Sequence, residues 1–314
     1  MSDSKTVYLA TRGSALALAQ SNLVLAQCRA LFPGRAFELK IIKTTGDKLQ
    51  TANLANPDQQ LPKGLFTKEL ELSMLNGETS LAVHSLKDLP TELPEGLGLA
   101  GVSVREDVRD VLIYRSKTGG KRVAEFAAGA TIATSSTRRQ AQLLALRPGL
   151  RTVPIRGNVG TRLNKLAERA DLDGIVLAMA GLKRLGYAIE DGRLAGGNVP
   201  EGLAVTVLPV EEMLPCVGQA ALGYECRKGD ALAEEICAAL NHSPTLQAVT
   251  AERAFLQAMG GGCLSPVGAF GEVSGGELRL RAVSFQNAQV KRAEKSSAPE
   301  QAGILGRAVA EALR

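Results

Sequence analysis

Two stretches of the sequence combine small polar residues with arginines in a pattern suited to binding an anion. The first runs from Thr131 to Arg139 and the second from Ile155 to Arg162. In each, a short β-type run ends in Ser, Thr, Gly or Asn residues and a helical pattern begins at once. A helix N-terminus offers unpaired N–H groups and a partial positive charge.

Four arginines accompany these two helix starts: Arg138, Arg139, Arg156 and Arg162. The planar guanidinium matches a carboxylate or phosphate with two parallel hydrogen bonds. We therefore predict a site for an acidic ligand, one with several carboxylates. The alternative is two surface helices capped by their own Ser, Thr or Asn side chains, with solvated arginines.

Two further residues could take part in covalent or acid–base chemistry. Asp88 follows a predicted strand, the usual place for a working residue in an α/β unit, and Lys87 beside it favours the ionised carboxylate. A simple turn before Pro90 would explain Asp88 equally well. Cys263 follows three glycines, so its thiol is predicted to be accessible, although a free Cys is often only a small apolar residue.

The elements that must position these residues alternate between strand and helix. A strand over 5–10 ends in the turn Thr11 to Ser14, which carries Arg12 and Ser14, and a helical pattern follows to Leu31. This order repeats at Thr131, so we expect two similar halves. Further strands are predicted at 37–42, 80–85, 97–104, 111–115, 131–134, 151–155 and 174–178, with helices at 64–75, 122–128, 137–146, 159–170 and 180–186. The alternation predicts an α/β fold with mostly parallel mixed sheets.

The remaining chain divides the molecule into three parts. A Gly-rich loop is expected at 192–202, and 208–227 is expected to return to the first unit. Helices at 230–240 and 245–259, a hairpin at 267–284 and a helix at 301–313 indicate a smaller α+β domain. We predict domain 1 over 1–105 and 217–240, domain 2 over 106–216, and domain 3 over 241–314. The polar stretch 46–63, flanked by Lys63 and Phe66, is either a binding loop or a surface insertion.

Composition limits the classes of function. The chain has 314 residues, a net charge of +5, no Trp and only two His. With no Lys/Arg run and few aromatic residues for base stacking, we expect no nucleic-acid partner. Five cysteines without CxxC spacing argue for a reducing compartment and against a metal site. No signal peptide or membrane-length apolar run is visible, so we expect a cytoplasmic protein.

The chain resembles the porphobilinogen deaminase family, also called hydroxymethylbilane synthases, over almost its whole length. The resemblance rests on several motifs in order. They are Ala10-Thr11-Arg12, Lys63-Gly64-Leu65-Phe66, Val83-His84-Ser85-Leu86-Lys87-Asp88-Leu89-Pro90, Thr134-Ser135-Ser136 with Arg138-Arg139-Gln140, Arg156-Gly157-Asn158-Val159-Gly160-Thr161-Arg162, Ala178 to Gly186, Glu225-Cys226-Arg227 and Gly261-Gly262-Cys263.

The resemblance implies a fold, a reaction and a set of site residues. The fold is two domains like those of periplasmic binding proteins plus an α+β domain. The reaction joins four porphobilinogen molecules into hydroxymethylbilane for tetrapyrrole biosynthesis, on a dipyrromethane cofactor held by a thioether at Cys263. Asp88 matches the catalytic carboxylate, and a monomer is implied. The implied binders of substrate or cofactor are Arg12, Ser14, Lys63, Phe66, Ser85, Lys87, Thr134, Ser135, Ser136, Arg138, Arg139, Arg156, Gly157, Asn158, Arg162 and Gln219.

Departures from the family pattern and two rival hypotheses stand beside this expectation. Pro62 replaces a Gly, Thr45 stands where some members carry Arg, and Ala220 replaces a Gly; these bear on loop dynamics and rate more than on reaction type. One rival is a non-catalytic two-domain binding protein or sensor for a multi-carboxylate ligand. The other is a transferase that uses the Cys263 thiol in every turnover.

Overall fold

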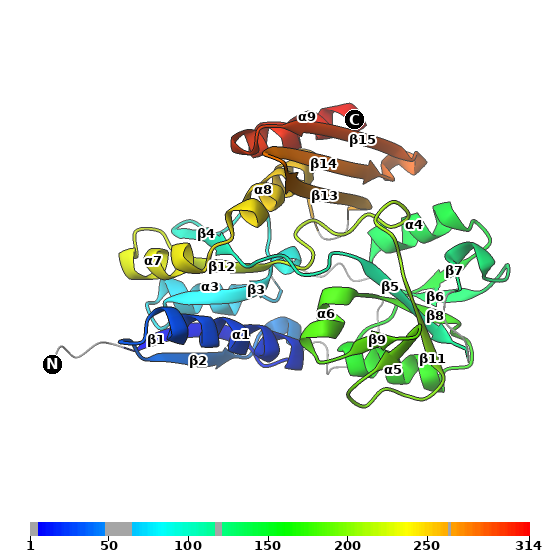
Figure 1. The fold of residues 1–314 in the computed structure, drawn as a ribbon, viewed down its shortest axis with the longest axis horizontal. Coiled ribbons are helices and arrows are strands. Elements are labelled where there is room, and N and C mark those ends of the chain that lie inside the picture. Colours follow the sequence, from blue (N-terminus) through cyan, green and yellow to red (C-terminus); the bar gives the residue numbers. More distant parts are fainter. Residues whose placement is uncertain (1–5, 48–64, 117–120, 263–264) are drawn as a thin grey trace.

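The computed structural model describes residues 6–47, 65–116, 121–262 and 265–314, and these form three sheets with their helices (Figure 1). In the ribbon, the first sheet is blue to cyan except for the yellow-green β12, the second is green and the third is orange to red. The C-terminus lies beside the third sheet. The prediction of an α/β molecule with an additional α+β part is thus confirmed.

The first sheet has the strand order β2-β1-β3-β12-β4. Helices α1 and α7 pack on one face through Val24 and Ile236, and α3 covers the other through Leu70 and Met74. The elements are β1 Val7–Arg12, α1 Ala15–Leu31, β2 Phe37–Ile42, α3 Lys68–Leu75, β3 Leu81–Ser85, the 3₁₀ turn η1 Leu86–Asp88, β4 Leu97–Val102, β12 Leu222–Arg227 and α7 Ala231–Leu240.

The second sheet has the order β7-β6-β8-β5-β11-β10-β9. Its two faces form separate apolar clusters, one centred on Leu163 of α5 and the other including Leu143 of α4. The elements are β5 Asp110–Arg115, the 3₁₀ turn η2 Val123–Glu125, β6 Thr131–Ala133, α4 Thr137–Leu146, β7 Arg151–Val153, α5 Val159–Glu168, β8 Gly174–Ala178, α6 Met179–Arg184, β9 Ala188–Glu190, β10 Arg193–Ala195 and β11 Leu203–Val207.

The third sheet is antiparallel and packs against two helices. Phe255 of α8 and Leu305 of α9 lie in its core, opposite Leu278 and Leu280 of the sheet. The elements are α8 Ser243–Ala258, β13 Val267–Ser274, β14 Glu277–Ser284, the 3₁₀ turns η3 Gln286–Ala288 and η4 Pro299–Gln301, β15 Lys291–Ser297 and α9 Ala302–Leu313.

The sheets are mixed as predicted, but their parallel share is smaller than expected. Strand β1 pairs in parallel with β2 and β3, and β6 pairs in parallel with β7 and β8. Strand β12 runs antiparallel to both of its neighbours, and β5 does the same in the second sheet. Both strands follow a connection that arrives from the other sheet, so they enter from the opposite end. Strand–helix alternation carries no signal for that direction.

Two local predictions were wrong, and one edge strand was missed. The helix expected at 122–128 is the single 3₁₀ turn η2. The Gly-rich segment 192–202 contains β10, which pairs with β9 at the edge of the second sheet. Strand β15 was not predicted, because its sequence KRAEKSS is largely polar and most of its side chains are exposed. Charged side chains are typical of edge strands, where they discourage pairing with other chains.

Two connections join the first and second sheets, and they lie against each other. Glu106 N–H donates to Ala220 O at 3.3 Å, and Arg105 Nε donates to Gln219 O at 3.0 Å. Buried Glu252 of α8 receives both terminal nitrogens of Arg105, at 2.6 and 3.0 Å, and the N–H of Gly218 at 2.7 Å. The third part is thereby anchored to both connections.

Candidate active site

The predicted site residues meet at one edge of each large sheet, namely the edge formed by the carboxyl ends of β1, β3 and β6. Strands β1 and β3 end in Arg12 and Ser85, and β6 ends just before Thr134. Because β5 and β12 are antiparallel to their neighbours, their first residues lie at the same edges: Asp110 pairs with Ala178 at the end of β8, and Leu222 pairs with Ser85. The edge is therefore lined by strand ends and strand starts together.

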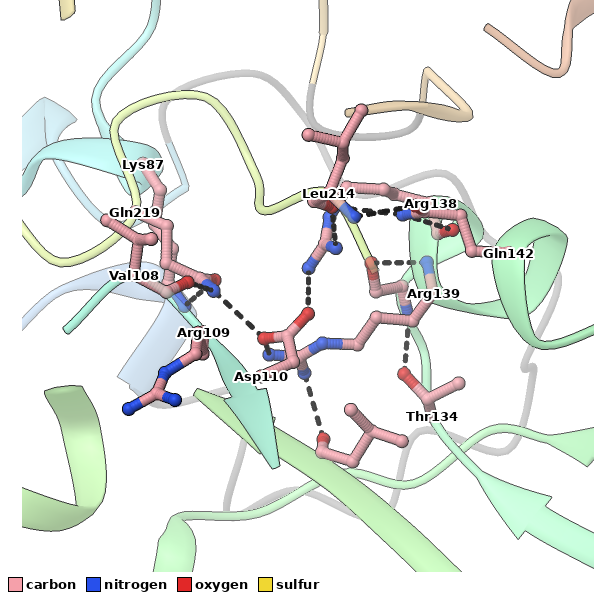
Figure 2. Close-up of polar contacts among 12 residues, drawn as sticks. Lys87, Val108, Arg109, Asp110, Thr134, Arg138, Arg139, Gln142, Leu214 and Gln219 are labelled. Atoms are coloured by element: carbon pink, nitrogen blue, oxygen red, sulfur yellow. Dashed lines mark hydrogen bonds and ion pairs between the residues drawn. The ribbon is translucent and has the colours of Figure 1, made fainter. Parts of the chain in front are cut away.

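Asp110 is the centre of a buried polar network (Figure 2). Its carboxylate accepts from Arg138 Nη2 at 2.8 Å, Arg139 Nη2 at 2.7 Å and Gln219 Nε2 at 2.9 Å. Gln219 Oε1 in turn accepts from Lys87 Nζ at 3.3 Å. Four predicted binding residues from both sheets are thus joined through one carboxylate.

The two arginines are not the solvated side chains of the alternative hypothesis. Arg138 Nη1 donates to Leu214 O at 2.6 Å, and Arg139 Nη1 donates to Val176 O at 2.9 Å. The Nε atom of each is buried and has no hydrogen-bond partner among the described residues. Burial alone would raise the pKa of Asp110, but the two guanidinium groups hold it well below its usual range.

Electrostatics indicates an excess of positive charge at this edge. Burial lowers the pKa of Lys87, and the nearby charge of Arg139 lowers it further, whereas Asp88 acts in the opposite direction. Burial and the charge of Arg139 also lower the pKa of Arg162 to about 10, again opposed by Asp88. Lys87, Arg139, Arg162 and Asp88 therefore lie within electrostatic reach of one another, although they come from three separate sequence motifs.

Three of the predicted polar residues cap helices in the described structure. Ser14 accepts from Ala17 N–H at 3.3 Å, Ser136 from Arg139 N–H at 3.4 Å, and Asn158 from Thr161 N–H at 2.8 Å. The capping alternative is correct for these side chains. A cap uses one of the N–H groups at a helix start, so it does not remove the partial positive charge there.

Gly157 shapes the second arginine-bearing turn. Its φ is +116°, and a Cβ atom there would meet Thr161 Cγ2 at 2.7 Å. Its carbonyl accepts from Arg162 Nε at 2.7 Å, which fixes the guanidinium beside the turn. Glycine is therefore required for conformation as well as for space.

Arg12 is held by groups that a ligand would have to share or replace. Its guanidinium lies 4.2 Å from the centre of the Phe66 ring, and its Nε donates to Asp47 Oδ2 at 3.3 Å. Ser85, at the end of β3, is hydrogen bonded to Gln20 at 2.9 Å.

The other predicted site residues in the described ranges are exposed or make local hydrogen bonds. Asp88 is exposed in η1, and Arg156 is exposed after β7. Ser135 Oγ donates to Ile155 O at 2.9 Å, and Thr134 Oγ1 accepts from Ser136 N–H at 3.2 Å. The predictions for Lys63 and Cys263 lie outside the described residues.

Asp110 and Gln20 were not predicted as site residues. Asp110 directly precedes the strand expected at 111–115, and Gln20 lies in the middle of a helix. An Asp directly before a predicted strand, after a run of charges, was the available signal for Asp110. No signal in the sequence pointed to Gln20.

Fold and site together define an α/β protein whose two mixed sheets present an arginine-rich edge with an excess of positive charge. Within the described ranges, no cluster of His, Cys, Asp or Glu could hold a metal ion, and no helix is long and apolar enough to cross a membrane.

Comparison with known proteins identifies the family. Residues 7–235 match the family model "Porphobilinogen deaminase, dipyromethane cofactor binding domain", and residues 246–314 match "Porphobilinogen deaminase, C-terminal domain". The porphobilinogen deaminase of Desulforudis audaxviator is 46% identical over 98% of this chain and 94% of its own length. That of Geobacter metallireducens is 48% identical over 88% of this chain and 80% of its own length. The chain belongs to the porphobilinogen deaminase family, the hydroxymethylbilane synthases of tetrapyrrole biosynthesis, and contains the domain that binds the dipyrromethane cofactor.

Solved structures give a much weaker likeness. The VFT2 domain of BvgS from Bordetella pertussis covers 75% of this chain and 86% of its own length, with 16% identity and a TM-score of 0.43. A periplasmic sulfonate-binding protein from Methylobacillus flagellatus covers 81% of this chain and 70% of its own length, with 12% identity and a TM-score of 0.41. Neither bears on the family or the site.

Proposed function

We propose that this chain joins four porphobilinogen molecules head to tail, releases ammonia at each addition and frees hydroxymethylbilane. Family membership supports the reaction class. The observation that carries the proposal is that Lys87 and Arg162 each lie within electrostatic reach of both Asp88 and Arg139. Each porphobilinogen brings two carboxylates, so an edge with excess positive charge suits both the substrate and a growing product.

The described residues fit a bound dipyrromethane. Built from two substrate units, this group carries four carboxylates. The proposed site offers this group four cations, Lys87, Arg138, Arg139 and Arg162. It also contains two carboxylates, Asp88 and Asp110. The unpartnered Nε atoms of Arg138 and Arg139 are further donors that a carboxylate could satisfy. When bound, the group supplies the pyrrole end on which the product grows.

We assign the carboxylate-binding role to residues along the two edges. Arg156 and Arg162 offer charge at the second sheet, while Arg12 does so at the first. Arg138 and Arg139 contribute mainly their charge, because Asp110 already engages their terminal nitrogens. The full proposed set is Arg12, Ser14, Lys63, Phe66, Ser85, Lys87, Thr134, Ser135, Ser136, Arg138, Arg139, Arg156, Gly157, Asn158, Arg162 and Gln219.

Asp88 is proposed as the catalytic carboxylate. Loss of ammonia from the aminomethyl arm leaves a positively charged pyrrole, and a fixed carboxylate beside the ring nitrogen stabilises that charge. The same carboxylate can pass a proton to the departing amine or accept one from the ring. Its exposed position in η1, next to Lys87, supports this role because substrate can reach it.

Cys263 is proposed as the attachment point of the cofactor. Its thiolate attacks once, when the thioether forms and ammonia leaves the first substrate unit, so it needs access rather than a permanent base. We further propose a cytoplasmic monomer with domain 1 at 1–105 and 217–240, domain 2 at 106–216 and domain 3 at 241–314. The return of β12 to the first sheet supports this division.

The intact mass of the purified, denatured protein tests the proposal, with Cys263→Ser beside it. A surplus equal to two porphobilinogen units less two ammonia, present in wild type and absent in Cys263→Ser, is the expected result. An unmodified mass in an active preparation would overturn it. An inactive, unmodified preparation is first incubated with porphobilinogen, and failure to gain either mass or activity would also overturn it.

The same preparations separate the two rival functions. A non-catalytic binding protein predicts that Cys263→Ala retains full function and that wild type carries no adduct. A thiol-dependent transferase predicts that iodoacetamide modifies Cys263 in the purified wild type. The proposal predicts that this thiol is already blocked.

A further inference from the structure

Helix α8 contacts the turn that carries Asp88 through hydrogen bonds and apolar packing. The guanidinium of Arg253 forks across two consecutive carbonyl groups directly after Asp88. Its Nη1 donates to Leu89 O at 3.0 Å, and its Nη2 donates to Pro90 O at 2.6 Å. A bidentate guanidinium fixes the orientation as well as the position of its partners.

Apolar packing joins the same two elements. Val249 of α8 is fully buried in a cluster with Leu86 and Leu89, the residues on either side of the turn. Leu246, one turn earlier on the helix, packs against the same cluster. The turn therefore rests on α8 through both its side chains and its backbone.

Helix α8 also leads toward the proposed cofactor cysteine. It ends at Ala258, five residues after Arg253, and Cys263 follows five residues later. At about 1.5 Å per residue, Arg253 lies only about 7 to 8 Å along the axis from the end of the helix. The helix that contacts the Asp88 turn is thus also the helix that precedes the proposed cofactor cysteine in the sequence.

We infer that Arg253 is a positioning residue that fixes the turn bearing Asp88 and thereby the place of the Asp88 carboxylate in the site. This inference rests on the proposed roles of Asp88 and Cys263. Arg253 itself touches the backbone of the turn, so it acts through the placement of Asp88. Misplacing a catalytic group by about 1 Å can cost about a hundredfold in rate.

The first test is steady-state turnover of Arg253→Lys with porphobilinogen. Lysine keeps the charge but lacks the two terminal nitrogens of the planar guanidinium, so kcat should fall about tenfold to a hundredfold while KM stays within about twofold. Gln257→Ala is the matched control. Gln257 lies one turn further along α8 and contacts Glu92 at 3.3 Å, so its loss should leave kcat unchanged. An unchanged kcat in Arg253→Lys would overturn the inference.

A double-mutant cycle separates positioning from general damage to the fold. If Arg253 acts through Asp88, Arg253→Lys should have almost no effect on the residual turnover of Asp88→Asn. A drop of the same size in both backgrounds would overturn the inference. Arg253→Gln, which has a single donor nitrogen and no charge, replaces Arg253→Lys in the cycle if thermal unfolding shows that the lysine variant does not fold.

Intact mass distinguishes failure of this inference from failure of the proposed function. Arg253→Lys should carry the same adduct as wild type. An adduct missing from wild type would refute the proposed function. An adduct missing only from Arg253→Lys would place Arg253 in cofactor assembly and overturn its role toward Asp88.

Discussion

Asp110 Oδ1 lies 2.7 Å from Arg139 Nη2, and both side chains are buried. The pair joins the first residue of β5 to the first turn of α4, and the two residues are 29 positions apart in the sequence. It therefore fixes a helix start against a strand start at the edge where the anionic ligand is proposed to bind.

Asp110→Asn should weaken both the fold and the site. The substitution keeps the shape but leaves two buried guanidinium groups without their carboxylate, which typically costs about 3 to 5 kcal/mol. Urea unfolding should show this loss, and KM for porphobilinogen should rise in the fraction that remains folded. Asp171→Asn removes an exposed ion pair with Arg169 and should leave the unfolding midpoint unchanged. Equal midpoints for wild type and Asp110→Asn would contradict the structural role of the network.

The stability contributed by Asp110 should depend on pH in a defined direction. Its pKa is depressed in the folded protein, so the unfolded state binds the proton more readily. The contribution is fully present above the unfolded value of about 4 and is lost as pH falls below it. Urea unfolding of wild type and Asp110→Asn between about pH 3 and 7 should therefore converge on the acid side. A constant difference across this range would show that the carboxylate charge is not the cause.

Lys87→Arg should change the alkaline limb of substrate binding. The pKa of Lys87 is lowered, first by burial and then by Arg139, so this lysine loses its positive charge at a lower pH than an ordinary lysine. KM for porphobilinogen should rise toward alkaline pH in wild type, and the rise should begin later in Lys87→Arg because arginine keeps its charge. Lys183→Arg, at an exposed lysine paired with Glu106, serves as the control. Identical pH profiles for wild type and Lys87→Arg would exclude Lys87 from carboxylate binding.

Gly157→Ala should impair the turn that holds Arg162. The added Cβ would sit 2.7 Å from Thr161 Cγ2 at a φ of +116°, and the turn must shift to relieve both. KM for porphobilinogen should rise about tenfold, equivalent to about 1.4 kcal/mol of binding free energy. Gly34→Ala is the control, since nothing lies within 4 Å of a Cβ atom there. A normal KM in Gly157→Ala would show that the position of Arg162 does not depend on this turn.

Sequence patterns predicted the regular elements well where burial and capping agree. Helix α4 occupies 137–146 and strand β8 occupies 174–178, as expected, because a capping Ser or a continuous apolar run marks each. Strand β15 escaped prediction because its side chains face solvent at a sheet edge. Strand direction also escaped, since it depends on which sheet the chain has just left.

The residue types of the site could be predicted more readily than the hydrogen-bond partners of those residues. The arginines of the 131–139 stretch were expected to face a ligand, and their charge does lie at the proposed edge. Asp110, 28 residues before Arg138, neutralises part of this positive charge. The contact is tertiary, and no local sequence pattern indicates it. The roles of Asp88 and Cys263 stay predictions that rest on family resemblance. The mass and turnover measurements proposed above test them.

The two connections between the large sheets give the site a mechanical property. They lie against each other, hydrogen bonded at Glu106 and Ala220, so any swing of one sheet relative to the other turns about this place. Displacement in a rotation grows with distance from the axis. Asp110 directly follows one connection and Gln219 lies within the other, so both move little in such a swing. A ligand of increasing length could be accommodated by movement of groups farther from this place, while the contacts of Asp110 and Gln219 are kept.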